Sequence, residues 1–211
     1  MTTPRHTTAV AALAALAMLL TACAESTDGT PETPNDNSEQ DEQHSSPELP
    51  HSGAPPVDDP IDTTRFEEDP CLALSDQQLT EYGYEYEDVE ARVTMHADHV
   101  CEWNMGRGEG TFVIGFTVEN QHGLSGVYQA HGLETWEVFD QADPVHGHPA
   151  LFADPIDARE RGACNVIFGA NDELAVWVTM DAGRHSPHRD APCRAAYELA
   201  ELAVETMKGD S

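Results

Sequence analysis

Three pairs of closely spaced histidines stand among many carboxylates, and they are the side chains best suited to chemistry in this sequence. The pairs are His96 and His99, His146 and His148, and His185 and His188. Imidazole and carboxylate groups can bind zinc or another divalent ion where enough of them converge. These pairs fall in expected loops or strand ends, without a helix to align two ligands on one face. They are weak metal candidates, and the sequence predicts no metal and no cofactor.

A catalytic arrangement is equally hard to find. The segment Gly123-Leu124-Ser125-Gly126 does not match the Gly-x-Ser-x-Gly turn that holds a nucleophilic serine. The glycine-rich segment 106–110 precedes a strand pattern and carries no Lys-Ser or Lys-Thr, so it predicts a hairpin turn and not a phosphate-binding loop. We therefore expect a protein that is not an enzyme.

Cys23 is the most informative of the five cysteines. After a short basic segment, a run of twelve apolar residues extends from Ala9 to Leu20. Thr21 and Ala22 then lead directly into Cys23. This run is shorter than the roughly 20 apolar residues that cross a membrane, and it matches a secretory leader. A cysteine at the cleavage point is typical of a bacterial lipoprotein. We expect residues 1–22 to be removed and Cys23 to be acylated, by palmitate or a similar chain, at the extracytoplasmic face of the membrane.

The other four cysteines form an even set in an exported chain, which favours disulfides. Four cysteines allow three pairings. We choose Cys71–Cys101 and Cys164–Cys193, because each joins the start of an expected helix to a nearby strand across about 30 residues. No Cys-x-x-Cys spacing indicates a metal or redox site.

The charge of the chain is strongly acidic, with a formal net charge of -29. Such a field repels phosphates, so we exclude nucleic acid as a partner. The acidity fits either capture of cations or a basic partner, or a solvated surface adapted to salt. Residues 23–60 contain no Lys, Arg or aromatic residue and many polar and proline residues. We expect them to form a disordered acidic tether.

Residues 61–211 have the patterns of a single α+β domain. Ser75 and Gln78 form a capping box for a helix over about 76–82, and a weak strand is expected at 89–94. Alternating apolar residues predict hairpins over 99–118 and 164–180, a short strand at 136–139 and another after a turn at 144–149. A helix is expected over 124–130, and Asp190 is expected to cap a closing amphipathic helix.

These elements predict an antiparallel sheet of about five to seven strands, with N- and C-terminal helices packed on one face and two disulfides. The segments Asp69-Pro70-Cys71, Cys101-Glu102-Trp103 and Gly147-His148-Pro149-Ala150, together with Cys164, Cys193 and the acylation motif, resemble actinobacterial cell-envelope lipoproteins of the domain of unknown function 3558. The resemblance implies a secreted domain with two disulfides, and it implies no catalytic residue.

The expected function is a membrane-anchored, non-catalytic binding or scaffolding module of the cell envelope, with an envelope protein or a small ligand as its unknown partner. Two alternatives remain open: a lipoprotein that binds a divalent metal through the loop histidines, and a carrier for a small ligand or lipid. Aromatic residues such as Tyr82, Tyr84, Tyr86 and Trp136 could line a binding surface or pack in the core. A deep apolar cavity would favour the ligand carrier, and a flat patch would favour a protein partner.

Overall fold

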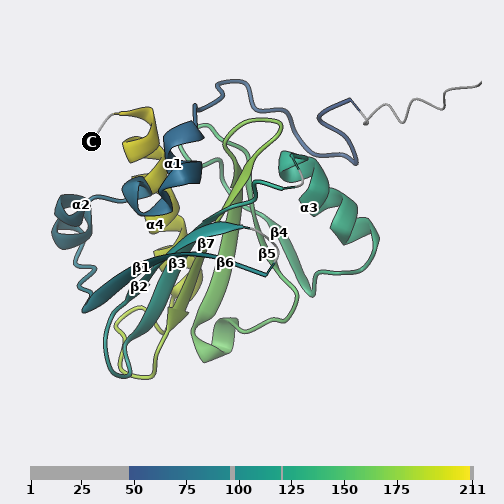
Figure 1. Ribbon diagram of the computed structural model, residues 1–211. Coiled ribbons are helices and arrows are strands. Elements are labelled where there is room, and N and C mark those ends of the chain that lie inside the picture. The colour runs from purple at the N-terminus through teal and green to yellow at the C-terminus, as the bar shows by residue number, and fades with distance from the viewer. Residues whose placement is uncertain (1–47, 96–97, 120, 210–211) are drawn as a thin grey trace, which may run out of the picture. The chain divides into compact units, whose positions relative to one another are not determined.

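A computed structural model describes residues 48–95, 98–119 and 121–209, all of which belong to one compact unit, Ser45–Ser211 (Figure 1). The leader, Cys23 and the tether up to residue 47 lie outside the described residues. Lipid anchoring therefore stays a prediction.

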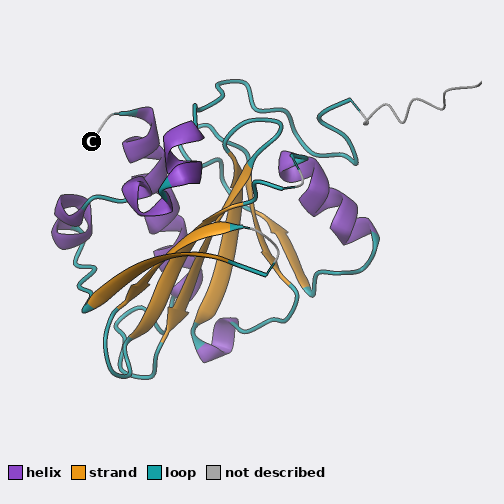
Figure 2. Ribbon diagram, viewed as in Figure 1, coloured by secondary structure: helices purple, strands orange, loops and turns teal. Residues whose placement is uncertain are grey.

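The described residues of this unit form seven strands, four α-helices and two short 3-10 helices, whose arrangement is drawn in Figure 2. In chain order the elements are α1 (Thr64–Glu68), η1 (Pro70–Ala73), α2 (Asp76–Glu81), β1 (Asp88–Val93), β2 (His99–Asn104), β3 (Gly110–Phe116), α3 (Gly123–Gly132), β4 (Val138–Gln141), β5 (Ala150–Asp154), η2 (Arg159–Arg161), β6 (Ala163–Gly169), β7 (Ala175–Ala182) and α4 (Pro192–Lys208).

All seven strands form one antiparallel sheet in the order β1-β2-β3-β7-β6-β5-β4. The first three strands follow one another along the chain, and so do the last four in reverse. The two sets meet where β3 pairs with β7. This arrangement confirms the predicted α+β class, with the sheet at the upper end of the expected size.

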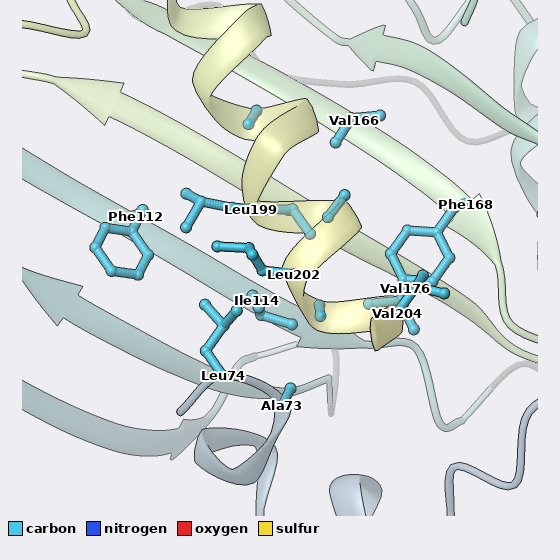
Figure 3. Packing of buried hydrophobic residues seen from close by; sticks show 14 of the residues in the cluster. Ala73, Leu74, Phe112, Ile114, Val166, Phe168, Val176, Leu199, Leu202 and Val204 are labelled. Carbon is cyan, nitrogen blue, oxygen red and sulfur yellow. The ribbon is translucent and has the colours of Figure 1, made fainter. Parts of the chain in front are cut away.

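One face of the sheet carries the main core, beneath α4 and the N-terminal helices (Figure 3). Alternate residues of β6 and β7, such as Val166 and Val178, point to this face and are fully buried. Leu199 of α4 is also fully buried there. Phe66 of α1 stacks on Phe116 of β3 with ring centroids 6.5 Å apart. The terminal helices therefore pack on one face, as the sequence predicts.

The opposite face is covered in part by α3. Leu124 at the start of α3 packs in a small cluster with Leu151, Ile167 and Ala175 from three neighbouring strands. Leu151 and Ile167 are paired across β5 and β6, so their side chains share this face. The sheet thus has a large core on one side and a small one on the other.

Both predicted disulfides are present. Cys71 in η1 is bonded to Cys101 in β2, and Cys164 in β6 is bonded to Cys193 in the first turn of α4. Each bridge fastens a helical element to a strand of the sheet.

The helix ends follow the sequence signals in one case and depart from them in another. Ser75 and Gln78 form the predicted capping box of α2. For α4 the prediction of an Asp190 cap is wrong: Ala191 is the N-cap residue and makes no side-chain cap bond. Pro192 starts the helix instead, since its missing N–H and fixed φ suit the first turn.

The folded domain begins earlier than residue 61. Residues 48–60, which the sequence pattern assigns to the tether, lie within the compact unit. Ala54 and Val57 are buried, and the Val57 N–H donates to Asp172 Oδ1 at 2.9 Å. The physical reason is that the two buried apolar side chains and the anchored amide attach this short polar segment to the domain. The sequence pattern did not reveal these contacts, because the composition averaged over residues 23–60 is that of a disordered segment.

Candidate functional site

A groove lies between α3 and the sheet face opposite α4, with a volume of about 480 Å³. Its residues come from α3, from the segment before β4, from the end of β5, from β6 and β7, and from positions next to the ends of β2 and β3. Only the first turn of α3 is buried, at Gly123, Leu124 and Ser125. The later turns stand over the groove as one of its walls.

The floor and walls of the groove are mainly apolar. Trp177 of β7 and Ile167 of β6 line the floor, and Val127 of α3 and Trp136 line the wall. The Trp136 indole N–H donates to the Val127 carbonyl at 3.0 Å, which fixes the ring beside α3. Both indoles are half-buried, so part of each ring surface stays open to a ligand.

Trp177 lies flat across β3 because its cross-strand neighbour is a glycine. Gly115 pairs with Trp177, and a Cβ at Gly115 would lie 2.1 Å from the indole Cε2. No other residue type leaves room for the ring there. The glycine thereby lets a large aromatic surface form the floor of the groove.

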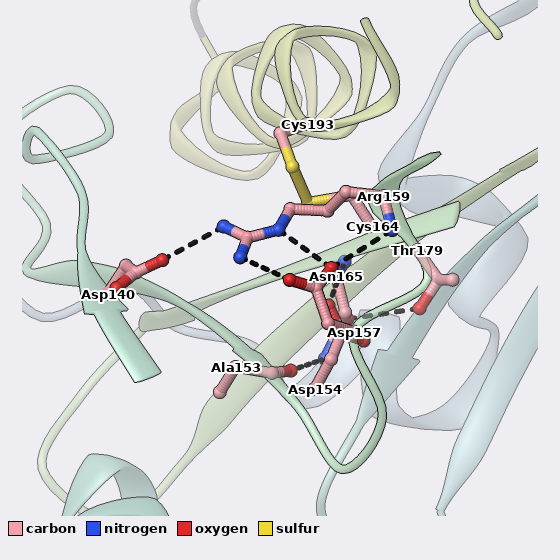
Figure 4. Close-up of a disulfide and its surroundings, with 9 residues drawn as sticks. All are labelled: Asp140, Ala153, Asp154, Asp157, Arg159, Cys164, Asn165, Thr179 and Cys193. Atoms are coloured by element: carbon pink, nitrogen blue, oxygen red, sulfur yellow. Dashed lines mark hydrogen bonds and ion pairs between the residues drawn. A yellow bond between two sulfur atoms is a disulfide. The ribbon is translucent and has the colours of Figure 1, made fainter. Parts of the chain in front are cut away.

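One end of the groove is polar and is built around Asn165 of β6 (Figure 4). The Asn165 side-chain amide donates to the Ala153 carbonyl at 2.9 Å, and its Oδ1 accepts from the Thr179 hydroxyl at 3.0 Å. The backbone N–H of Asn165 donates to Asp154 Oδ2 at 3.1 Å. These bonds hold the Asn165 and Asp154 side chains in place at the groove.

Burial raises the pKa of the Asp154 carboxyl to about 6. The hydrogen bond from the Asn165 N–H lowers this pKa. The negative charge of Asp157 raises the pKa, and the positive charge of Arg159 lowers it. Arg159 is itself engaged by two other carboxylates: it bonds Asp157 at 2.5 Å and Asp140 at 3.0 Å (Figure 4). Among the described residues, no basic side chain forms an ion pair with Asp154. Perturbed carboxyls in clefts are typical of binding and catalytic sites.

None of the described histidines named from the sequence lines this groove. His96 lies outside the described residues. The His99 ring bonds the Glu67 carbonyl. The His146 ring lies 3.4 Å from a Glu205 carboxylate oxygen, on the other side of the domain's sheet.

The remaining histidines are dispersed as well. His148 is buried, donates from Nδ1 to the Gly169 carbonyl at 2.9 Å, and has its pKa lowered by burial. His188 stacks on Tyr84 at 4.6 Å, and His185 is exposed on a loop. Among the described residues, no group of three or more His, Cys, Asp or Glu side chains converges as a metal site.

A second hollow lies beside His188 but is smaller, at about 240 Å³. Tyr84 next to it is buried and donates to Glu198 at 3.1 Å, so it belongs to the core. Of the aromatic residues considered from the sequence as a binding surface, Tyr82 is exposed and Trp136 lines the large groove.

Sequence reasoning missed the polar end of the groove. The available signal was the presence of Asn165 and Thr179 at outward positions of two otherwise apolar strands. Asp154 gave no such signal, because an aspartate at the end of a strand is common in turns.

In the part of the chain that the structure describes, no helix is long and apolar enough to span a membrane. Comparison with curated proteins and with solved structures found no match. A family model described as a protein of unknown function, DUF3558, matches residues 18–206. That match includes the sheet, all four helices up to Thr206, both disulfides and the groove, and the chain therefore belongs to the DUF3558 family.

Proposed function

We propose that this chain is a membrane-anchored extracytoplasmic lipoprotein whose domain binds a small ligand with an apolar body in the groove beside α3. The observation that carries the binding role is the groove itself. It has about 480 Å³ of space, two half-buried indoles and a few fixed polar groups. Ligand pockets in proteins have volumes of roughly 300–1,000 Å³ and the same mixture of apolar walls and few polar groups.

The anchoring rests on the sequence and on the disulfides. The apolar run that ends at Cys23 has the form of a lipoprotein leader. The two disulfides support export, because such bonds persist in oxidising compartments. An acyl chain on Cys23 would hold the domain at the membrane surface.

A ligand carrier is favoured over a scaffold because the candidate surface is concave. A protein partner of ordinary affinity needs a contact area of roughly 800 Å² on each side, which is usually flat. The half-buried Trp136 and Trp177 instead face a hollow between α3 and the sheet. We keep the role non-catalytic, since the Thr179 hydroxyl at the polar end donates to Asn165 Oδ1 and is paired with no base among the described residues of the groove.

The binding role is tested with 1-octanol as an apolar probe, followed by tryptophan fluorescence of residues 24–211, which contain the compact unit. Ala130 of α3 lines the groove and its neighbour Gln129 is exposed. We expect saturable binding that Ala130→Phe abolishes by filling the groove and that Gln129→Phe leaves unchanged. Absence of saturable binding, or equal binding by both variants, would overturn the proposed role.

The anchor is tested separately with Cys23→Ala in the full chain. We expect this variant to leave the membrane fraction or to remain unprocessed, while the domain keeps its fold. A processed variant that still partitions with membranes would show that the lipid anchor is wrong.

A further inference from the structure

The polar end of the groove presents acceptor atoms to a ligand. Asp154 Oδ2 accepts from the Asn165 N–H, while Asp154 Oδ1 has no protein partner among the described residues. The Asn165 amide is already oriented by Ala153 and Thr179. A ligand that reaches this end therefore meets a carboxylate oxygen that still needs a donor.

The described residues that line the groove include no Lys, Arg or His, so none of them supplies a cation to that oxygen. Arg159, which acts on Asp154 only at a distance, is bonded to Asp157 and Asp140. A partly buried carboxylate without a paired cation favours a ligand that brings a positive charge.

The aromatic walls suit the same ligand. Trp177 and Trp136 are half-buried and line the groove, and indole is the aromatic group that attracts cations most strongly. The net charge of -29 adds a long-range field that draws cations toward the domain and repels anions.

Building on the proposed binding function, we propose that the ligand is a small amphiphile with a protonated amine, which bonds Asp154 while its apolar body lies on Trp177 and Ile167. The carboxylate and the apolar floor lie in one groove, so a single small molecule can reach both. Neutral and anionic amphiphiles of the same length lack either the charge or its correct sign.

The test compares octylamine and octanoate below their critical micelle concentrations with 1-octanol below its solubility limit, by tryptophan fluorescence and calorimetry at pH 7.5. At this pH the Asp154 carboxyl, with a pKa of about 6, is ionised. We expect octylamine to bind about tenfold or more tightly than 1-octanol, since bonds to charged groups are the stronger ones. Octanoate should bind most weakly.

Asp154→Asn is the decisive variant, and Asp190→Asn is its matched control because Asp190 is exposed and outside the groove. Asp154→Asn should weaken octylamine about tenfold and leave 1-octanol unchanged, which also shows that the groove is intact. Asp190→Asn should leave both unchanged.

The outcomes separate the two proposals. If 1-octanol binds as tightly as octylamine, or Asp154→Asn weakens neither, the amine specificity is wrong and the binding function stands. If none of the three probes binds, the binding function fails and the amine specificity fails with it.

Discussion

The two faces of the sheet are covered by helices of very different design. The helix α4 has 17 residues, ten of them buried, and the disulfide at Cys193 fastens it to β6. The helix α3 has 10 residues, of which only the three in its first turn are buried. The α4 face is closed and the α3 face is left open over a groove.

This difference assigns separate tasks to the two faces. Burial of apolar surface is the main stabilising contribution to folding, so most of the stability resides beneath α4. The α3 face contributes less to stability. It can therefore contain a groove, a partly buried carboxyl and half-buried indoles. Stability and binding are thus built on opposite sides of one sheet.

The largest expected effect is truncation beneath α4. Leu199→Ala removes a fully buried side chain from the main core and should lower the free energy of unfolding by about 3–5 kcal/mol. Val127→Ala in α3 removes a half-buried side chain and should cost about 1 kcal/mol. Urea denaturation measures both. Equal losses would break the distinction between the faces.

The disulfide on the α4 face should rank next. Replacing Cys164 and Cys193 by alanine opens a loop of 29 residues in sequence separation and should cost about 3 kcal/mol. The urea midpoint of the double variant measures this. Probe binding at the groove should persist at 10 °C in the folded fraction, and its loss there would show that the two faces are coupled.

A smaller effect is expected at the floor of the groove. Gly115→Ala places a methyl group against the Trp177 ring and should cost about 2 kcal/mol and shift the tryptophan emission. Gly132→Ala is the control, because a Cβ there meets nothing within 4 Å and a helix favours alanine. Unchanged emission in Gly115→Ala would contradict the described position of the ring.

The smallest effect concerns the pH dependence of stability. The pKa of Asp154 is raised from 3.8 to about 6, so between these values the folded state binds more protons than the unfolded state. Stability should therefore fall as pH rises through this window, by about 1 kcal/mol, since the carboxyl is only partly shielded from water. Asp154→Asn should remove this loss. Denaturation of both proteins at pH 4 and pH 7.5 measures it, and an identical pH profile would show that Asp154 is not desolvated.

The sequence predicts the α4 face well. Apolar residues alternate along β6 and β7 and recur at helical spacing along α4. This local spacing predicts which of these side chains are buried. The disulfide pairing follows from the same elements, because each bridge joins a helical element to a strand about 30 residues away.

The α3 face is less predictable for a physical reason. Asp154, Asn165 and Trp177 come from three strands, and only the strand register brings them to one groove. The histidines gave the stronger chemical signal in the sequence, but those that the structure describes do not converge on a metal site. Spacing along the chain does not encode proximity across a sheet.

An amide chemical-shift titration of residues 24–211 with 1-octanol locates the bound probe on one face of the sheet. We predict shifts at Val127, Ile167 and Trp177, with Leu199 of α4 unaffected. Shifts centred on α4, or no shifts at saturating probe, would contradict the assignment of binding to the α3 face.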